Sequence, residues 1–499
     1  MARLGLVLVL TLLLLPPAAV GGAPFPAPAE AAPAPPPFAF CDGWARFIDV
    51  EAAEYAVVFD VGRKTASAKS TLSFKLAEPG YPLFDLVPEP REVKVDGAPA
   101  GQELVLSPER TLQMRALLNR PLPAGTHSLS MEHSIVEAVR FDAGGVSSFF
   151  QISDLEDRGF LERYLPTNLE HDAYAMTLDV GVRGPAREYS VYTNGTVSRT
   201  GPQSWRIVFP AHFGCSSVYF HLVPSEEAVE ERFELPSSRG SPIPVVVYRL
   251  RDGSESRLRK SLGEYRAKIT EVVSDLEKTY GPWPHPGLLV QGGDPIKGME
   301  YCGAATARVK SLDHELFHSY LGRGIIPANG NAGWIDEAVA TWRERGRPSR
   351  PGPPEPGPPL AGRSVYARHT EGSAFAAGAE VIAHLDYLLR DRGGMDEFLR
   401  RQFRERMHRR WDTGTFEWAL MDFSGAGFGE LFASSVYGRP GEPGRILARR
   451  SGWRGWIVPS AIGVVVGLLL AGIVVWRRRI LKARSQSAAR PGTAGSKDK

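Results

Sequence analysis

The stretch Asp313-His-Glu-Leu-Phe-His-Ser-Tyr320, with Gly333-Trp-Ile-Asp-Glu-Ala338 after it, decides how the rest of the chain is read. His314 and His318 lie four residues apart, so on a helix both imidazoles leave the same face and can bind one cation. A catalytic zinc usually takes three protein ligands and keeps a fourth position open. Glu337 is therefore the candidate third ligand.

Glu315 follows the first histidine, where a carboxylate can act as a general base toward water at the metal. The second helix is expected over 333–343, with residues 329–331 as the loop and cap before it. The pattern His-Glu-x-x-His, eighteen residues and then Glu resembles the gluzincin zinc metallopeptidases, and within them the aminopeptidase-N-like family. The resemblance implies one Zn²⁺ on His314, His318 and Glu337, with Glu315 as the catalytic base.

A second motif, Lys297-Gly-Met-Glu-Tyr301, precedes this helix. It resembles the Gly-x-Met-Glu-Asn segment of the same family, which lines an edge strand and binds the free α-amino group of the substrate through its glutamate. Gly298 stands where alanine is usual, and Tyr301 replaces asparagine. The resemblance implies that Gly298, Met299 and Glu300 bind substrate. The alternative for Glu300 is a solvated carboxylate at the end of a strand.

Members of this family also use a tyrosine hydroxyl to stabilise the oxyanion, shortly before a glycine that opens a helix. In this chain that place is Ala374-Phe375-Ala-Ala-Gly378, and phenylalanine cannot donate the hydrogen bond. Loss of one such donor costs about 2.7–4 kcal/mol in the barrier. We consider Tyr366 as the substitute oxyanion donor and Arg363 or His369 as positive donors, with packing or surface roles as the alternative for each.

The ends of the chain predict a secreted-side, membrane-tethered protein. Residues 1–23 have the charged start, apolar centre and small-residue exit of a secretory signal, with an uncleaved anchor as the alternative. Residues 24–38 form an Ala/Pro-rich linker. Residues 456–476 lack charge and are long enough for a transmembrane helix, and the basic tail at 477–499 fits a cytoplasmic end. A buried core helix or a cleavable sorting signal are the alternatives for 456–476.

The body of the chain predicts more than one domain, because 499 residues exceed an average domain. Short alternating runs punctuated by turn residues predict an all-β sandwich-like domain over 39–225. Seven of these runs lie at 55–59, 70–75, 92–95, 126–131, 175–180, 189–192 and 204–209.

The second part of the body reads differently. A charged segment at 225–232 comes first, and strands at 242–248 and 287–290 then flank a long amphipathic helix at 255–280. With the motif helix, the resemblance implies a thermolysin-like α+β catalytic domain over 226–348. Its loop and carboxyl-terminal helical part follow over 349–445, with helices expected at 374–389, 395–407 and 416–421.

Composition excludes several classes of function. The net charge of +3 and the 43% hydrophobic content argue against a disordered acidic chain and against a nucleic-acid footprint. Three cysteines are too few for a disulfide framework. Cys41 and Cys215 could pair in an oxidising compartment, with buried free thiols as the alternative, and Cys302 is expected to pack near the cleft.

The sequence therefore predicts a zinc metallopeptidase, and specifically an aminopeptidase. Its expected partners are peptide substrates and the membrane. A different class of function is a non-enzymatic protein that keeps the fold and binds peptides in the cleft, which Phe375 and Tyr301 favour. A zinc hydrolase of other substrates has no sequence feature of its own.

Overall fold

The computed structural model describes residues 33–439, except 109–112, 119, 143, 156–157, 252–259, 294–296 and 367. The expected signal, most of the linker, the expected membrane helix and the basic tail lie outside the described residues. Within the described part of the chain, every helix is too short or too polar to cross a bilayer.

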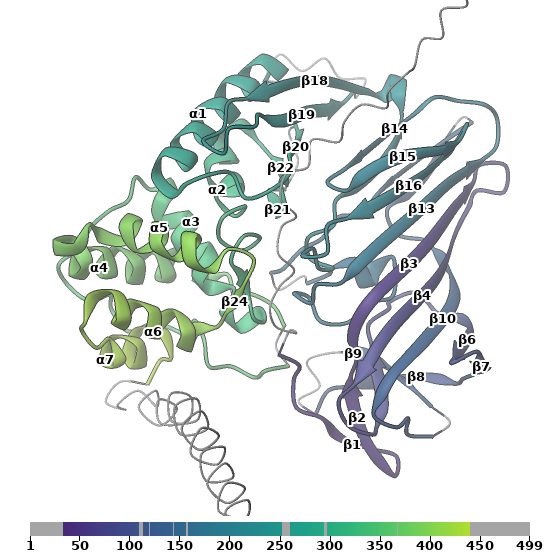
Figure 1. Ribbon diagram of the computed structural model, residues 1–499, viewed down its shortest axis with the longest axis horizontal. Helices are drawn as coiled ribbons and strands as arrows, with labels where there is room; N and C mark the ends of the chain where they lie inside the picture. The colour runs from purple at the N-terminus through teal and green to yellow at the C-terminus, as the bar shows by residue number, and fades with distance from the viewer. Residues whose placement is uncertain are drawn as a thin grey trace, which may run out of the picture.

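The amino-terminal β half, residues 38–224, contains three sheets (Figure 1). In the largest sheet only β13 and β3 pair in parallel, and all other neighbours are antiparallel. Side chains along its long strands alternate between buried and exposed, so one face covers the apolar core. Its eight strands run in the order β15 (Thr196–Gly201), β16 (Ser204–Phe209), β13 (Ala175–Arg183), β3 (Asp49–Asp60), β4 (Thr65–Leu76), β10 (Gly125–Ile135), β6 (Arg91–Val95) and β7 (Ala98–Pro99).

Two smaller sheets complete the β half. One runs in the order β1 (Phe38–Phe40), β2 (Gly43–Phe47), β5 (Tyr81–Phe84), β9 (Gln113–Leu117) and β8 (Gln102–Leu106). The other runs in the order β11 (Val139–Asp142), β12 (Gly145–Phe149), β17 (Phe220–Pro224) and β14 (Tyr189–Thr193). All seven alternating runs of the sequence lie in strands of this half. The half is β-rich, as predicted, but its strands divide among three sheets and not the two of a simple sandwich.

The helical half, residues 228–436, begins with a five-stranded sheet against which the first long helix packs. Its strands run in the order β18 (Ala228–Leu235), β19 (Ile243–Leu250), β20 (Leu288–Gly292), β22 (Ala304–Ala307) and β21 (Met299–Tyr301). Sequence reasoning described 225–232 only as a charged segment, yet β18 begins within it. Exposure alternates along β18, where Glu230, Arg232 and Glu234 are exposed and Glu231 and Phe233 are half-buried, as suits an edge strand with one solvated face.

The long helix α1 (Leu262–Tyr280) starts at a capping box, in which Ser261 accepts from the Glu264 amide and Glu264 accepts from the Ser261 amide. Figure 1 shows the later helices gathered on the side away from the β half, with β21 at the boundary. These helices are α2 (Leu312–Phe317), α3 (Trp334–Glu344), α4 (Ala379–Leu389), α5 (Gly394–Arg406), α6 (Thr413–Ser424) and α7 (Gly429–Leu431), with a π-helical turn at Ala374–Gly378.

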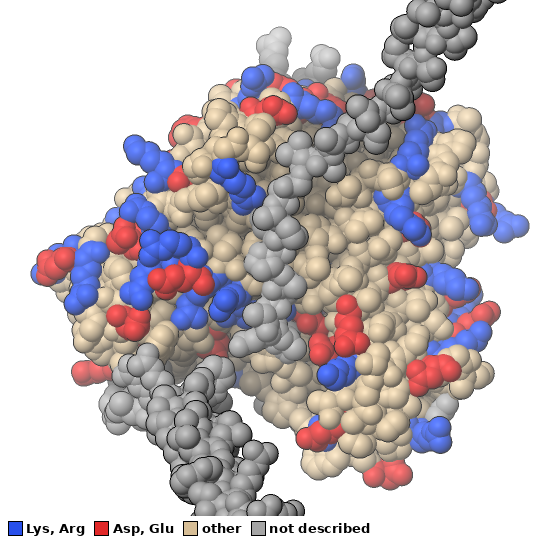
Figure 2. Space-filling view, viewed as in Figure 1, with Lys and Arg blue, Asp and Glu red and all other residues tan. Residues whose placement is uncertain are grey.

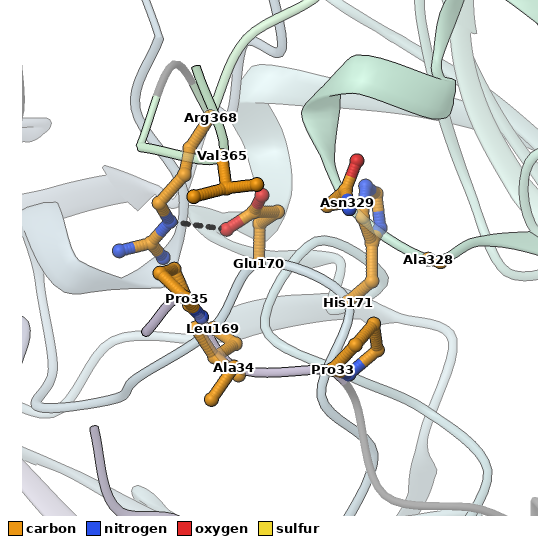
Figure 3. A pocket seen from close by; sticks show the side chains of 10 residues that line it. All are labelled: Pro33, Ala34, Pro35, Leu169, Glu170, His171, Ala328, Asn329, Val365 and Arg368. Carbon is orange, nitrogen blue, oxygen red and sulfur yellow. Dashed lines mark hydrogen bonds and ion pairs between the residues drawn. The ribbon is translucent and has the colours of Figure 1, made fainter. Parts of the chain in front are cut away.

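A buried ion-pair network joins the two halves (Figure 3). Arg368 of the helical half pairs with Glu170 of the β half and lies 2.8 Å from Asp85. Glu170 also accepts a hydrogen bond from the Gly330 amide at 3.2 Å. Burial alone raises the pKa of Glu170, but Arg368, Arg158 and His171 together outweigh it and bring that pKa to about 2. Because a buried charge without its partner is costly, this network fixes the loop that leads into α3.

A cavity of about 100 Å³ lies beside this network, with the paired Glu170 and Arg368 on one side and His171 and Asn329 on the other (Figure 3). Elsewhere the face in Figure 2 carries basic and acidic side chains intermixed around its rim. The three cysteines are free, Cys41 exposed and Cys215 and Cys302 buried, so the pairing of Cys41 with Cys215 is wrong.

Candidate metal centre

Three ligand atoms from two helices converge at the boundary. Nε2 of His314 lies 3.2 Å from Oε2 of Glu337, and Nε2 of His318 lies 3.5 Å from the same oxygen. A tetrahedral zinc with bonds of about 2.0–2.1 Å places neighbouring ligand atoms about 3.3–3.4 Å apart. The two measured separations fall on either side of this value, so the three side chains fit one tetrahedral ion.

The outer nitrogens of both imidazoles are turned away from Glu337. His318 Nδ1 lies 3.3 Å from the Leu321 carbonyl, which can only accept, so Nδ1 carries the proton. His318 Nε2 is then the nitrogen that faces Glu337, and it is buried without a hydrogen-bond partner among the described residues. A metal ion can satisfy an orphaned buried nitrogen that faces a carboxylate. His314 is oriented in the same way, because its Nδ1 lies 3.4 Å from Oε2 of Glu344.

The chain brings the two helices together through a tight loop. Helix α2 ends at Phe317, and His318 is its capping residue with helical backbone angles. The loop then turns at Gly322, whose φ of +109° favours glycine. A Cβ there would lie 2.6 Å from Oδ2 of Asp336 and 3.2 Å from Nδ1 of His318, so a side chain would push the helices apart.

Electrostatics make the site a receptor for a cation. Although burial lowers it, hydrogen bonds to Glu337 and Glu344 raise the pKa of His314 to about 10. Burial likewise lowers the pKa of His318, but Glu300 and Glu337 raise it well above its usual range. The negative charges of Glu300, Glu337 and Glu344 therefore stabilise a positive charge at the two imidazoles. A divalent metal would supply this charge in place of the imidazole protons.

Glu315, the predicted base, is buried on α2. Burial raises its pKa to about 8, with His314 opposing the shift. Its carboxylate lies against the backbone of Gly298, where a Cβ would be 2.8 Å from Cδ of Glu315 and closer still to Oε1. The glycine that replaces the family's usual alanine therefore leaves room for this carboxylate.

The predicted substrate segment forms β21, the edge strand of its sheet. Met299 and Glu300 are buried, so the alternative of a solvated carboxylate at Glu300 is wrong. Oε1 of Glu300 is 2.8 Å from Nη2 of Arg323, a partner that sequence reasoning did not foresee. Tyr301 is fully buried, packs edge to face on Tyr219 of the β half, and fills the boundary between the halves.

Two further charged residues, Asp154 and Arg323, lie at the site, and the sequence analysis did not identify them. Asp154 of the β half lies 3.8 Å from Nη2 of Arg323, and its carbonyl accepts from the Thr370 amide at 2.8 Å. Burial, and then Glu300 and Glu337, raise the pKa of Asp154 well above its usual range. Arg323 left one signal, because it is the sole Asp, Glu, Lys or Arg between Glu315 and Asp336. Asp154 left none, since only the fold brings it here.

The expected oxyanion donors lie differently. Phe375, in the π-helical turn, stacks on the His314 ring with centroids 6.0 Å apart and planes at 18°. Tyr366 packs in a third apolar cluster, and its hydroxyl donates to the Pro36 carbonyl at 2.8 Å. The expectation that this hydroxyl faces the metal ligands is therefore wrong. Arg363 and His369 both contact Glu371.

Comparison with protein-family models and with curated protein sequences finds no match. Solved structures do match. The M1 zinc metallopeptidase of Deinococcus radiodurans superposes with a TM-score of 0.54 at 19% identity, covering 79% of this chain and 95% of that one. A variant of that enzyme bound to a Tyr-Ser-Ala substrate gives 0.55 at 20% identity, covering 81% and 96%.

Native leukotriene A4 hydrolase from Saccharomyces cerevisiae gives a TM-score of 0.57 at 15% identity, covering 80% of this chain and 70% of that one. At sequence identities of 15–20%, the structural similarity supports a shared fold. The chain has the fold of the M1 zinc metallopeptidases.

Proposed function

We propose that this chain is a zinc-dependent metallopeptidase, and within that class an aminopeptidase. One observation carries the proposal: Nε2 of His314 and Nε2 of His318 converge on the Glu337 carboxylate at tetrahedral spacing, with Glu315 beside them. Zinc is the default ion for two imidazoles and one carboxylate.

The residues around this position can divide the work of amide hydrolysis. His314, His318 and Glu337 would hold the zinc ion, which would supply the acidification of water and the polarisation of a carbonyl group. Burial raises the pKa of Glu315 to about 8, and positive charge at His314 and His318 lowers it, which favours the carboxylate form that a base needs. It can accept the proton of the attacking water and return it to the leaving nitrogen. Glu344 lies near Nδ1 of His314 and Asp336 lies near Nδ1 of His318, and both carboxylates orient the imidazoles.

Peptides fit as the substrate class because β21 offers an edge strand beside Glu315. Backbone groups on the outer side of an edge strand can pair with an extended peptide. The Tyr-Ser-Ala complex of the Deinococcus enzyme supports the same class. Two carboxylates near this strand, Asp154 and Glu300, suit a substrate with a free amino terminus.

The test is hydrolysis of a panel of aminoacyl fluorogenic substrates by the zinc-loaded chain. Activity should disappear on chelation and return with zinc. Zinc-loaded protein that hydrolyses none of the substrates would remove the proposal. Release of the first residue, as against cleavage at an internal bond, would then separate aminopeptidase from endopeptidase action.

A second candidate function is peptide binding without turnover. The observation that favours it is Phe375, which places an apolar ring and no hydroxyl beside His314. Removal of one oxyanion donor slows catalysis by about 10²–10³. Peptide binding to the zinc-loaded chain with no product after long incubation would favour this role, and turnover that depends on Glu315 would dismiss it.

We also propose that the chain is exported and tethered by residues 456–476, with its metal centre outside the cytoplasm. The support is the sequence pattern of both ends. The full-length chain should sediment with membranes, and a chain without 456–499 should be released. A full-length chain that stays in the soluble fraction would contradict the tether.

A further inference from the structure

Glu300 is held by a buried cation of the protein itself. Nη2 of Arg323 lies 2.8 Å from Oε1 of Glu300, and Nε of Arg323 lies 3.4 Å from the Glu300 carbonyl. The Arg323 side chain is 1% exposed and that of Glu300 is 4%. A charge pair this deep is screened little by solvent, so the carboxylate that should bind an amino group is already largely neutralised.

The guanidinium is held firmly in this position. Arg323 lies in the loop after α2, and its amide donates to the His318 carbonyl at 2.8 Å. The loop closes further through the Ile325 amide, which donates to the Tyr320 carbonyl at 2.8 Å. A Cβ on Gly324 would clash with the backbone of Ser319 and Tyr320, so the loop lies tight against the end of α2. The pair with Glu300 is therefore part of the folded structure.

Asp154 shares the same cation. Its Oδ2 lies 3.8 Å from Nη2 of Arg323, and its side chain is 14% exposed. Burial, Glu300 and Glu337 hold the pKa of Asp154 well above its usual range, so Glu300 supplies the main negative charge beside β21. The guanidinium offsets this charge. Arg323 thus weakens the charge that could distinguish an ammonium from an uncharged amide.

We propose that Arg323 determines specificity by relaxing the demand for a free amino terminus, so that the site accepts peptides with an acylated amino end as well as free ones. The proposal rests on the proposed peptide site of this chain. It concerns discrimination between substrates and not the rate of the chemical step, because the Arg323 guanidinium contacts Glu300 and Asp154, whereas Arg323 meets the metal ligand His318 only through the backbone.

Binding measured without turnover tests it. The full-length, zinc-loaded chain carrying Glu315→Gln would be titrated calorimetrically with Ala-Ala-Ala and with its N-acetyl form. We expect the ratio of the two Kd values, acetylated over free, to stay below about 10, because Arg323 offsets the charge of the Glu300 carboxylate. Arg323→Gln should raise this ratio at least about tenfold, whereas Arg323→Lys, which keeps the charge, should leave it close to the parent value.

Glu300→Gln should change the ratio of the two Kd values in the opposite direction. It leaves the guanidinium facing Asp154 alone, so the ratio should fall below that of the parent. This variant also keeps the test decisive if Arg323→Gln does not fold, which a thermal melt would show. A parent ratio above about 100, an unchanged ratio in Arg323→Gln, or an unchanged or higher ratio in Glu300→Gln would overturn the proposal.

The proposed catalytic function fails in a different way. If the zinc-loaded chain with native Glu315 hydrolyses neither peptide, yet the binding ratios move as expected, the peptidase proposal falls and the role of Arg323 stands. If both peptides are hydrolysed and the ratios do not respond to Arg323, the peptidase stands and the inference falls.

Discussion

Gly298→Ala would test whether Glu315 works from the place in which it is seen. The new Cβ would lie 2.8 Å from Cδ of Glu315 and nearer to Oε1, whereas ordinary contact begins at 3.4 Å. The end of a glutamate side chain can yield, so the fold should tolerate the methyl group. The carboxylate must move by about 1 Å, and a displacement of that size costs up to about 100-fold in rate.

We expect kcat to fall about 10- to 100-fold in this variant while zinc content and thermal stability stay at the parent values. Steady-state kinetics with one aminoacyl substrate, alongside metal analysis, would measure this. Gly427→Ala is the matched control, since its Cβ would meet nothing within 4 Å. Alanine is the usual residue at this place in the family that the sequence resembles, so the substitution is a mild one. An unchanged or higher kcat would refute the reasoning and show that Glu315 acts from another position.

Three more predictions follow from single contacts. Phe375→Tyr adds a hydroxyl to the ring that stacks on His314, and kcat should rise about 10- to 100-fold with zinc content unchanged; a fall would show that no oxyanion lies near this ring. Glu344→Ala removes the acceptor 3.4 Å from His314 Nδ1 and should weaken zinc affinity about tenfold in chelator competition, whereas equal affinity would show that this contact does not orient the imidazole. Burial raises the pKa of Glu417 to about 7, so its stabilising contribution is complete below about pH 4.5 and lost as pH rises through 7. Glu417→Gln should therefore gain up to about 3 kcal/mol on the parent in denaturant unfolding between pH 5 and pH 8, and a gap that does not change with pH would contradict this.

Local patterns accounted for the regular elements well. Period-two alternation found strands such as β4 and β13 because one face of each is buried and the other solvated. Periodicity also found α3, although α3 is buried nearly all round and so lacks a clear polar face. The edge strand β18 was not predicted, because the consecutive charges of Glu230, Glu231 and Arg232 hide the alternation, and its pairing with β19 is decided by the sheet.

The metal cluster could be predicted because its spacing is local: His314 and His318 share one helix, and Glu337 lies on the next. The charges that surround it could not. Asp154 comes from the β half, and only the packing of the two halves brings it to Arg323. Tyr366 is a predicted site residue that the fold places elsewhere, because its hydroxyl donates a hydrogen bond to the carbonyl of Pro36, 330 positions away. Residues that act across the boundary between the halves leave no periodic signal in the sequence.

The most direct test of the central claim is hydrolysis by the purified, zinc-loaded chain beside Glu315→Gln, with zinc counted in both. Glu78→Gln, a change to an exposed glutamate of the β half, serves as the matched control. We predict about one zinc per chain in all three proteins, hydrolysis by the parent and the control, and loss of hydrolysis in Glu315→Gln. Zinc-free protein, or equal hydrolysis by Glu315→Gln, would contradict the account.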